Sequence, residues 1–390
     1  MQRLCLKFAI LSVSLLLTSA YAVSICIPVF TEQFTGYSAS SIEMLITIPA
    51  FSVMVMMLLS DFIASKLGKK RTVMLGLIIV CASVFLSLAA TSYPMMLISR
   101  IVLGIGLGLC NALAVSLIAD FFTGNECATM MGVRNAFEGL GQSLLTYVAG
   151  LLFVTGWSNA FYVYFAALPI LVIFALFVPS VTPEGGAPAP AEEKAESRGE
   201  RRLPWHALPQ CLILMFTVLV SVGFYVKLFD VIGEKSLNAD PEYVNNLFTA
   251  LAFCSMAGGC AFGFLYARMK FYSLQLGLIA TALSCLLLAF SPSMTVLTIA
   301  CVLNGLAYPI IISYMFNMIG RLSVNASTVM VTSFMLIGCN VGAMVTPWGF
   351  SLMSTLSGGG SAALCFIICG VIFLALALLA MVRRASFTCD

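Results

Sequence analysis

Hydrophobic residues run along this chain in long blocks that are interrupted by proline, glycine or charged residues. Most blocks reach about 20 residues, the length that an α-helix needs to cross the hydrocarbon core of a bilayer. Strands of a membrane barrel would instead alternate apolar and polar residues over about ten positions. The pattern predicts twelve spanning helices, at residues 6–29, 41–64, 72–91, 94–122, 128–154, 158–179, 208–229, 242–266, 272–290, 293–319, 326–353 and 360–382.

A polar segment at residues 180–207 divides these spans into two sets of six. It contains GGAPAPAEEKAESRGERR, and this bias toward proline, alanine and charge is typical of a flexible linker. We therefore predict an N-terminal six-helix bundle at 1–179, a cytoplasmic linker at 180–207 and a C-terminal six-helix bundle at 208–390.

The two sets of spans repeat each other. Equivalent positions recur 201 or 202 residues later, which aligns Lys66 with Arg268, Gly76 with Gly277, Arg100 with Cys301, and Gly104 with Gly305. The expected fold is therefore an all-α membrane protein with two parallel six-helix repeats. Because Arg100 has Cys301 as its counterpart, the halves are alike in framework and unlike in chemistry.

Composition agrees with a membrane protein. The chain is 61% hydrophobic and 9% charged, with a mean hydropathy of +1.06, whereas soluble domains carry about 25% charged residues. With a cytoplasmic N-terminus, every Lys and Arg except Arg100, Lys227 and Lys235 lies on or near the cytoplasmic side. We expect a multi-pass protein of the plasma membrane with both termini cytoplasmic. The net charge of +3 follows from this topology and does not indicate nucleic-acid binding.

The loop between the second and third spans carries a recognisable motif. Residues 61–71 read DFIASKLGKKR, which is similar to the pattern G-x-x-x-D-R-x-G-R-R. Asp61 and Ser65 stand where the pattern has Gly and Asp. Four positions match it: Lys66, Gly68, Lys69 and Lys70.

A second motif lies in the fourth span, where Arg100 is followed by Gly104 and Gly106 in the order R-x-x-x-G-x-G. With the six-plus-six layout, these motifs make the chain resemble the major facilitator superfamily over essentially its whole length. The resemblance implies a secondary transporter that works by alternating access. The fourth-span motif is common among proton-coupled members, especially drug/proton exporters. The fifth-span Gly-Pro motif of the antiporters is not intact, since Thr146-Tyr147 occupies its place.

Arg100 has two interpretations. It lies about seven residues, roughly 10 Å, inside its helix, and a charge at that depth is usually functional. On one interpretation it faces a central cavity, meets Glu138 there and tunes a proton-carrying group. On the other, it ties helices together through backbone carbonyl groups.

The fifth span carries Arg134, Glu138 and Gln142 at intervals of four residues, which places them on one helix face. Glu138 lies roughly 15 Å into the helix and is the candidate proton carrier, because a carboxyl in a low dielectric holds its proton more readily. The alternative is a permanent pair between Glu138 and Arg134 that braces the helix. We expect the proton-coupling residues to be Glu138, Arg100 and Arg134.

Two further sets complete the candidate residues. In the family, the loop after the second span holds the two halves together in one state, although plain positive-inside anchoring would also explain its lysines. The predicted gating residues are Asp61, Lys66, Lys69, Lys70, Arg71 and Asp120. Polar residues within spans are candidates for substrate contacts or for interhelical hydrogen bonds; they are Tyr21, Asn111, Gln142, Asn304, Tyr308 and Asn340.

No enzyme, cofactor or metal site is indicated. His206 is the single histidine, the cysteines form no CxxC pair, and there is no GxxxxGK[ST] phosphate loop. We expect a monomeric secondary transporter that uses protons to export drug-like or amphipathic compounds. The alternative is uptake or exchange of a small organic anion. A non-transporting sensor with the same fold would need a signalling domain, and neither the linker nor the tail carries one.

Overall fold

The computed structural model describes residues 2–122, 124–179, 207–237, 239–322, 328–359 and 361–384, and over these the chain is helical without a strand. Eleven of the described helices are long and apolar enough to cross a membrane. The bent pair Arg3–Ser14 and Ser19–Gln33 makes a twelfth span if it is counted as one. The predicted all-α membrane fold is confirmed.

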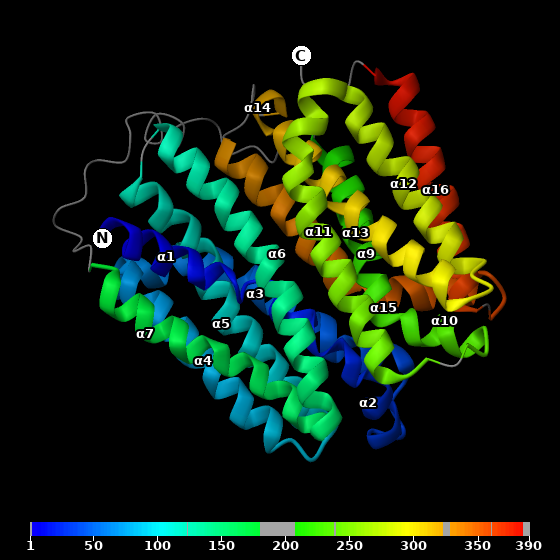
Figure 1. Ribbon diagram of the computed structural model, residues 1–390, viewed down its shortest axis with the longest axis horizontal. Helices are drawn as coiled ribbons and strands as arrows, with labels where there is room; N and C mark the ends of the chain where they lie inside the picture. The colour runs from blue at the N-terminus through cyan, green and yellow to red at the C-terminus, as the bar shows by residue number, and fades with distance from the viewer. Residues whose placement is uncertain are drawn as a thin grey trace. The chain divides into compact units, whose positions relative to one another are not determined.

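Contacts group residues Met1–Gly186 with Pro241–Thr249 into a first compact unit. Within it, α5 packs against both α3 and α4, while α6 packs against η1 and η2 (Figure 1). The elements of this part of the chain are α1 (Gln2–Ser14), η1 (Ser19–Cys26), α2 (Ile27–Gln33), α3 (Ala39–Leu67), α4 (Lys69–Leu88), α5 (Tyr93–Phe121), α6 (Gly124–Thr155), η2 (Trp157–Ala166) and α7 (Ala167–Phe177).

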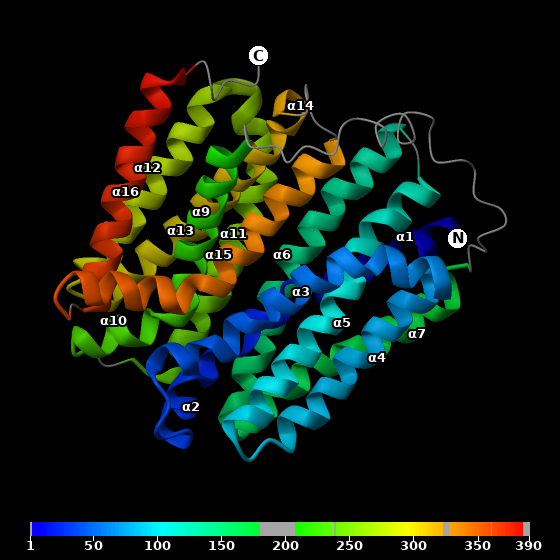
Figure 2. The same cartoon turned by 180° about the vertical axis from the view of Figure 1, so that it is seen from behind.

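The second unit comprises Ala187–Asp240 and Ala250–Asp390. Within it, α12 packs against α13 and α16, and α15 packs against α9 (Figure 2). Its elements are α9 (Leu208–Val226), α10 (Leu228–Glu234), α11 (Pro241–Met269, of which the first nine residues group with the first unit), α12 (Phe271–Ala289), α13 (Met294–Asn317), α14 (Ile319–Leu322), α15 (Thr328–Leu356) and α16 (Ala362–Val382). The predicted linker falls almost wholly on 180–206, outside the described residues.

One helix contact recurs in both units at the positions that the repeat equates. A Cβ atom built on Gly104 of α5 would lie 2.5 Å from the carbonyl oxygen of Pro49 on α3. A Cβ atom on Gly305 of α13 would lie 2.6 Å from the carbonyl oxygen of Leu251 on α11. Real Cβ atoms do not approach that closely, so each glycine lets two helices meet backbone to backbone.

The first span departs from the prediction of one continuous helix at 6–29. It is bent by 43° between Ser14 and Ser19 and continues as a 3-10 turn, in which Val23 leaves the helical region. Hydroxyl groups compete with the helix ladder here. Ser19 donates to the carbonyl oxygen of Leu16 at 2.6 Å and Ser24 donates to that of Tyr21 at 2.7 Å. The sixth span likewise begins as a 3-10 helix, η2.

Candidate functional site

Arg100 is buried at the junction of four elements. Only 1% of the residue is exposed, although it carries a full charge. Its Nε donates to the carbonyl oxygen of Leu45 on α3 at 2.9 Å, and its Nη2 donates to that of Ala20 on η1 at 2.6 Å. Its Nη1 donates to the hydroxyl oxygen of Tyr164 on η2 at 3.0 Å. These contacts are those expected of a residue that ties helices together.

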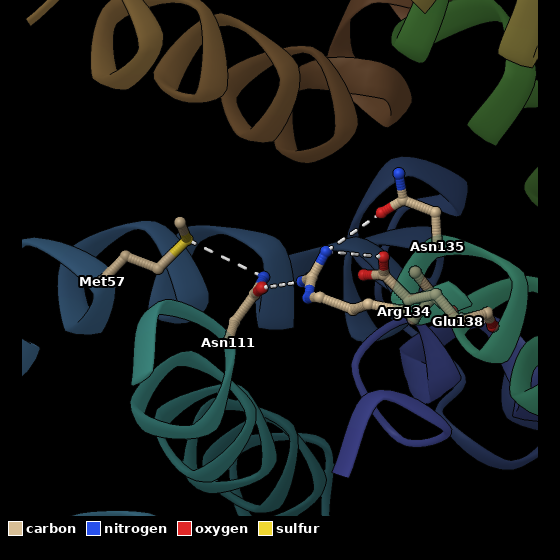
Figure 3. A network of polar contacts seen from close by, with 6 residues as sticks. Met57, Asn111, Arg134, Asn135 and Glu138 are labelled. Atoms are coloured by element: carbon tan, nitrogen blue, oxygen red, sulfur yellow. Dashed lines mark hydrogen bonds and ion pairs between the residues drawn. The ribbon is translucent and has the colours of Figure 1, made fainter. Parts of the chain in front are cut away.

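Arg134 is the centre of a second polar network, which joins α6 to α5 and α3 (Figure 3). Its Nη1 lies 3.3 Å from the Oε2 atom of Glu138 and 3.2 Å from the Oδ1 atom of Asn135. Its Nη2 donates to the Oδ1 atom of Asn111 at 2.9 Å. The amide of Asn111 in turn lies 3.9 Å from the sulfur of Met57. The side chains of Arg134 and Glu138 are 11% and 21% exposed, so the ion pair is largely shielded from water.

The expected meeting of Arg100 with Glu138 is not seen. Glu138 instead pairs with Arg134 one turn away on α6, as residues at i and i+4 can. All three nitrogens of Arg100 that donate bonds are directed to other elements. Instead, the backbone oxygen of Glu138 accepts a bond from the hydroxyl of Thr18 at 3.2 Å, which joins α6 to the bend in the first span.

The face of α6 beyond Glu138 carries unmet hydrogen-bonding capacity. Gln142 is 7% exposed, and neither its amide nitrogen nor its amide oxygen has a partner. Thr146, one turn further, is fully buried and its hydroxyl is also unpartnered, as is the Nε of Arg134. Buried polar groups usually have a partner, so unsatisfied ones indicate a position for water or a ligand. The predicted alignment of Arg134, Glu138 and Gln142 thus becomes a polar stripe along α6.

The predicted substrate residues are divided between the two units, with Tyr21, Asn111 and Gln142 in the first and Asn304, Tyr308 and Asn340 in the second. Asn304 is fully buried in the second unit, where its side-chain oxygen accepts from Ser221 at 3.3 Å and its amide donates to Ser284 at 3.4 Å. It therefore joins α13 to α9 and α12. The amide of Asn340 donates at 2.9 Å to a carbonyl of its own helix. Tyr21 and Tyr308 are half-buried, and Asn111 belongs directly to the Arg134 network.

The predicted gating residues make ties within the first unit. The ammonium of Lys69 lies 2.6 Å from the Oδ2 atom of Asp120, which joins the start of α4 to the end of α5. Lys70 donates at 2.7 Å to the carbonyl oxygen of Ala175 near the end of α7, where a helix attracts positive charge. Lys66 and Arg71 are exposed, and the ammonium of Lys66 lies over the ring of Phe62. Asp61 lies outside the described side chains.

Sequence reasoning missed a tie between the start of α1 and the start of α6. Glu126 accepts from Arg3 at 2.7 Å and from Lys7 at 2.6 Å. The hydrogen bond from Lys7 and the charge of Arg3 hold the pKa of the Glu126 carboxyl below its ordinary value of 4.5. The sequence-based predictions also did not include Glu43, an acidic residue of α3 that is 2% exposed. Its position inside a predicted span was the signal that could have identified it.

This tie should make a small, pH-dependent contribution to stability. Because the folded pKa of Glu126 is depressed, the contribution is present above pH 4.5 and is lost as the pH falls through the folded pKa. Thermal unfolding of the wild type and of Glu126→Gln should therefore differ at neutral pH and converge in acid. A difference that persists at the acid end would show that the charge of Glu126 is not its cause.

Residues 9–234 match the family model described as Major Facilitator Superfamily. The chain belongs to the Major Facilitator Superfamily. Members of this superfamily are membrane-embedded transporters of small molecules and are not enzymes. The protein is therefore a multi-pass membrane protein of this superfamily, as its helices and its repeat predict.

The proteins that this chain is similar to have names that point to different solutes. Quinolone resistance protein NorA of Staphylococcus aureus (strain MSSA476) is 22% identical over 240 residues, which are 62% of this chain and 59% of NorA. Multidrug transporter protein MdtP of Bacillus subtilis (strain 168) is 31% identical over 117 residues, which are 30% of this chain and 21% of MdtP. A crystal structure of a D-xylose-proton symporter superimposes with a TM-score of 0.73 at 16% identity, over 97% of each chain.

Proposed function

We propose that this protein is a proton-coupled secondary transporter that exports drug-like or amphipathic compounds from the cell by alternating access. The observation that carries the proposal is the shielded pair of Arg134 and Glu138, beside the unpartnered amide of Gln142 on the same helix. The names of NorA and MdtP, a quinolone resistance protein and a multidrug transporter, support the choice of substrate.

In the proposed cycle, Glu138 carries the proton. When Glu138 takes up a proton, its attraction to Arg134 falls, since the ion pair loses one of its charges. Arg134 keeps its bonds from Nη2 to Asn111 and from Nη1 to Asn135, so the guanidinium stays in place while the contact of Nη1 with Glu138 weakens. Substrate and proton then compete for the same polar stripe, with Asn111 and Gln142 offering hydrogen bonds to the solute.

Uptake or exchange of a small organic anion is the second candidate. It is favoured by the guanidinium of Arg134, which is nine-tenths buried and has an unpartnered Nε. A carboxylate could accept from Nε and from the neighbouring Nη2 as a planar pair of hydrogen bonds. In this case the negative solute would bind the edge of Arg134 that Glu138, at Nη1, leaves open.

The remaining expectations belong to the same proposal. The protein would lie in the plasma membrane as a monomer with both termini cytoplasmic, as the distribution of Lys and Arg indicates. The ties of Lys69 and Lys70 would then lie at the cytoplasmic ends of the first unit. There, with Asp61, Lys66, Arg71 and Asp120, they would control the closure of that side.

Flux through the purified protein would test these candidates. Proteoliposomes with an imposed pH gradient should accumulate a fluorescent lipophilic cation, and other lipophilic cations should compete with it. Competition by small carboxylates alone would instead select the anion transporter. Absence of flux for both classes would reject proton-coupled transport of either kind.

A further inference from the structure

Pro49 interrupts the hydrogen-bond ladder inside α3. Proline has no N–H group, so the carbonyl of Leu45, four residues earlier, cannot receive the bond that an α-helix normally supplies. The structure shows what takes the place of that donor: the Nε of Arg100 donates to the carbonyl oxygen of Leu45 at 2.9 Å. We propose that Pro49 and Arg100 form a matched pair, in which the arginine of α5 replaces the amide that the proline removes from α3.

The same guanidinium also serves the break in the first span. Its Nη2 donates to the carbonyl oxygen of Ala20, within the 3-10 turn that follows the bend. Its Nη1 donates to the hydroxyl of Tyr164, and that hydroxyl in turn donates to the carbonyl oxygen of Ser19 at 3.2 Å. Two interrupted helices are therefore fastened by one side chain and its tyrosine partner. This is why a charged residue can remain 1% exposed without an acidic partner among these contacts.

The second repeat supplies a natural control within the same chain. Gly305 meets Leu251 just as Gly104 meets Pro49, so Leu251 occupies the position of the proline. A leucine has the amide that continues a helix, and the position of Arg100 is taken there by Cys301. The proline and the arginine are thus both present in one repeat and both replaced in the other. This is the pattern expected if each requires the other.

In this pair, Pro49 acts as a positioning residue for Arg100. By withholding an amide it creates an acceptor inside the membrane-spanning part of α3, and this acceptor fixes the guanidinium against α3. Arg100 then acts as a set of directed donors rather than as a mobile charge. A lysine, which has one nitrogen, cannot reach three acceptors on three elements at once.

A double-mutant cycle on the purified full-length protein tests the Pro49–Arg100 pair by thermal unfolding. Arg100→Met should lower the unfolding temperature markedly, because it leaves buried acceptors unpaired. Adding Pro49→Ala restores an amide that can donate to the carbonyl of Leu45, which is one of the three acceptors. After any effect of Pro49→Ala alone is subtracted, the double variant should therefore recover about a third of the lost unfolding temperature. Pro309→Ala, which removes a proline inside α13, is the matched control and should recover nothing.

Strict additivity of Arg100→Met and Pro49→Ala would overturn the proposal. So would a wild-type unfolding temperature for Arg100→Lys, since charge alone would then suffice. If Arg100→Met yields no folded protein, Arg100→Gln takes its place in the same cycle, and a coupling of the same sign but smaller size is expected because its one amide can still serve some of the acceptors. Because unfolding is measured without any solute, this result stands independently of proton coupling and of the transported compound.

Discussion

Replacing Glu138 by glutamine should abolish proton-driven transport while leaving the protein folded. Glutamine is nearly isosteric and can still accept a hydrogen bond from Arg134, but it cannot bind and release a proton near neutral pH. Arg134 also keeps its contacts with Asn111 and Asn135, so the guanidinium is not left without a partner. Accumulation against a gradient should therefore fall to the level of empty liposomes.

The measurement separates coupling from binding. Proteoliposomes with an imposed pH gradient report the driven flux, and exchange of labelled for unlabelled solute at equal pH reports transport that needs no net proton movement. Glu138→Gln should lose the first and retain the second. Glu126→Gln is the matched control, because it changes an acid of the same helix that lies outside the spanning segment. Driven flux that survives in Glu138→Gln would assign Glu138 to a permanent brace with Arg134.

Features set by local spacing were predictable from the sequence. Span lengths follow from the length of apolar runs, and the repeat follows from matching glycines and charges at a constant offset. The ion pair of Arg134 with Glu138 follows from a spacing of four residues on a helix. The tie of Lys69 to Asp120 joins two residues that both flank predicted loops at the same face of the membrane.

Contacts set by tertiary packing were not predictable in this way. Arg100 bonds to Leu45, Ala20 and Tyr164, which lie on three elements at separations of 55 to 80 residues. No local rule says which buried acceptor a guanidinium will reach. The proline inside the second span was nevertheless a visible signal, since a helix proline always withholds one amide. The break in the first span also escaped prediction, because hydroxyl side chains continue many membrane helices without bending them.

The two networks give Arg100 and Arg134 different tasks. Arg100 has fixed acceptors on three elements, so any movement of the first span against α3 and α5 has to break directed bonds. Arg134 has a partly exposed partner, Glu138, which is the proposed proton carrier. The proposed proton-dependent change needs an ion pair that can lose one charge, as in the Arg134 network. It also needs fixed bonds that hold the surrounding helices, as in the Arg100 network.

Replacing Gly104 by alanine should destabilise the protein strongly, although alanine is the better helix former by about 1 kcal/mol. Its Cβ atom would lie 2.5 Å from the carbonyl oxygen and 2.8 Å from the Cα atom of Pro49, and backbone atoms cannot rotate away. The helices must separate, at a cost of about 1–3 kcal/mol for overpacking. Gly132→Ala on α6 is the control, because a Cβ there meets nothing within 4 Å and should leave the unfolding temperature unchanged or slightly raised.

Gly305→Ala in the second repeat sharpens this test. Its Cβ atom would lie 2.6 Å from the carbonyl oxygen of Leu251, so the steric cost should be similar. In the first repeat, however, separating α5 from α3 also lengthens the bond from Arg100 to Leu45, because Arg100 lies one turn from Gly104. A buried, charge-assisted hydrogen bond contributes about 1.5–3 kcal/mol. Gly104→Ala should therefore lower the unfolding temperature more than Gly305→Ala, and in an Arg100→Met background the two losses should become equal. If Gly104→Ala and Gly305→Ala lower the unfolding temperature equally in the wild-type background, Arg100 does not contribute to the contact between α3 and α5.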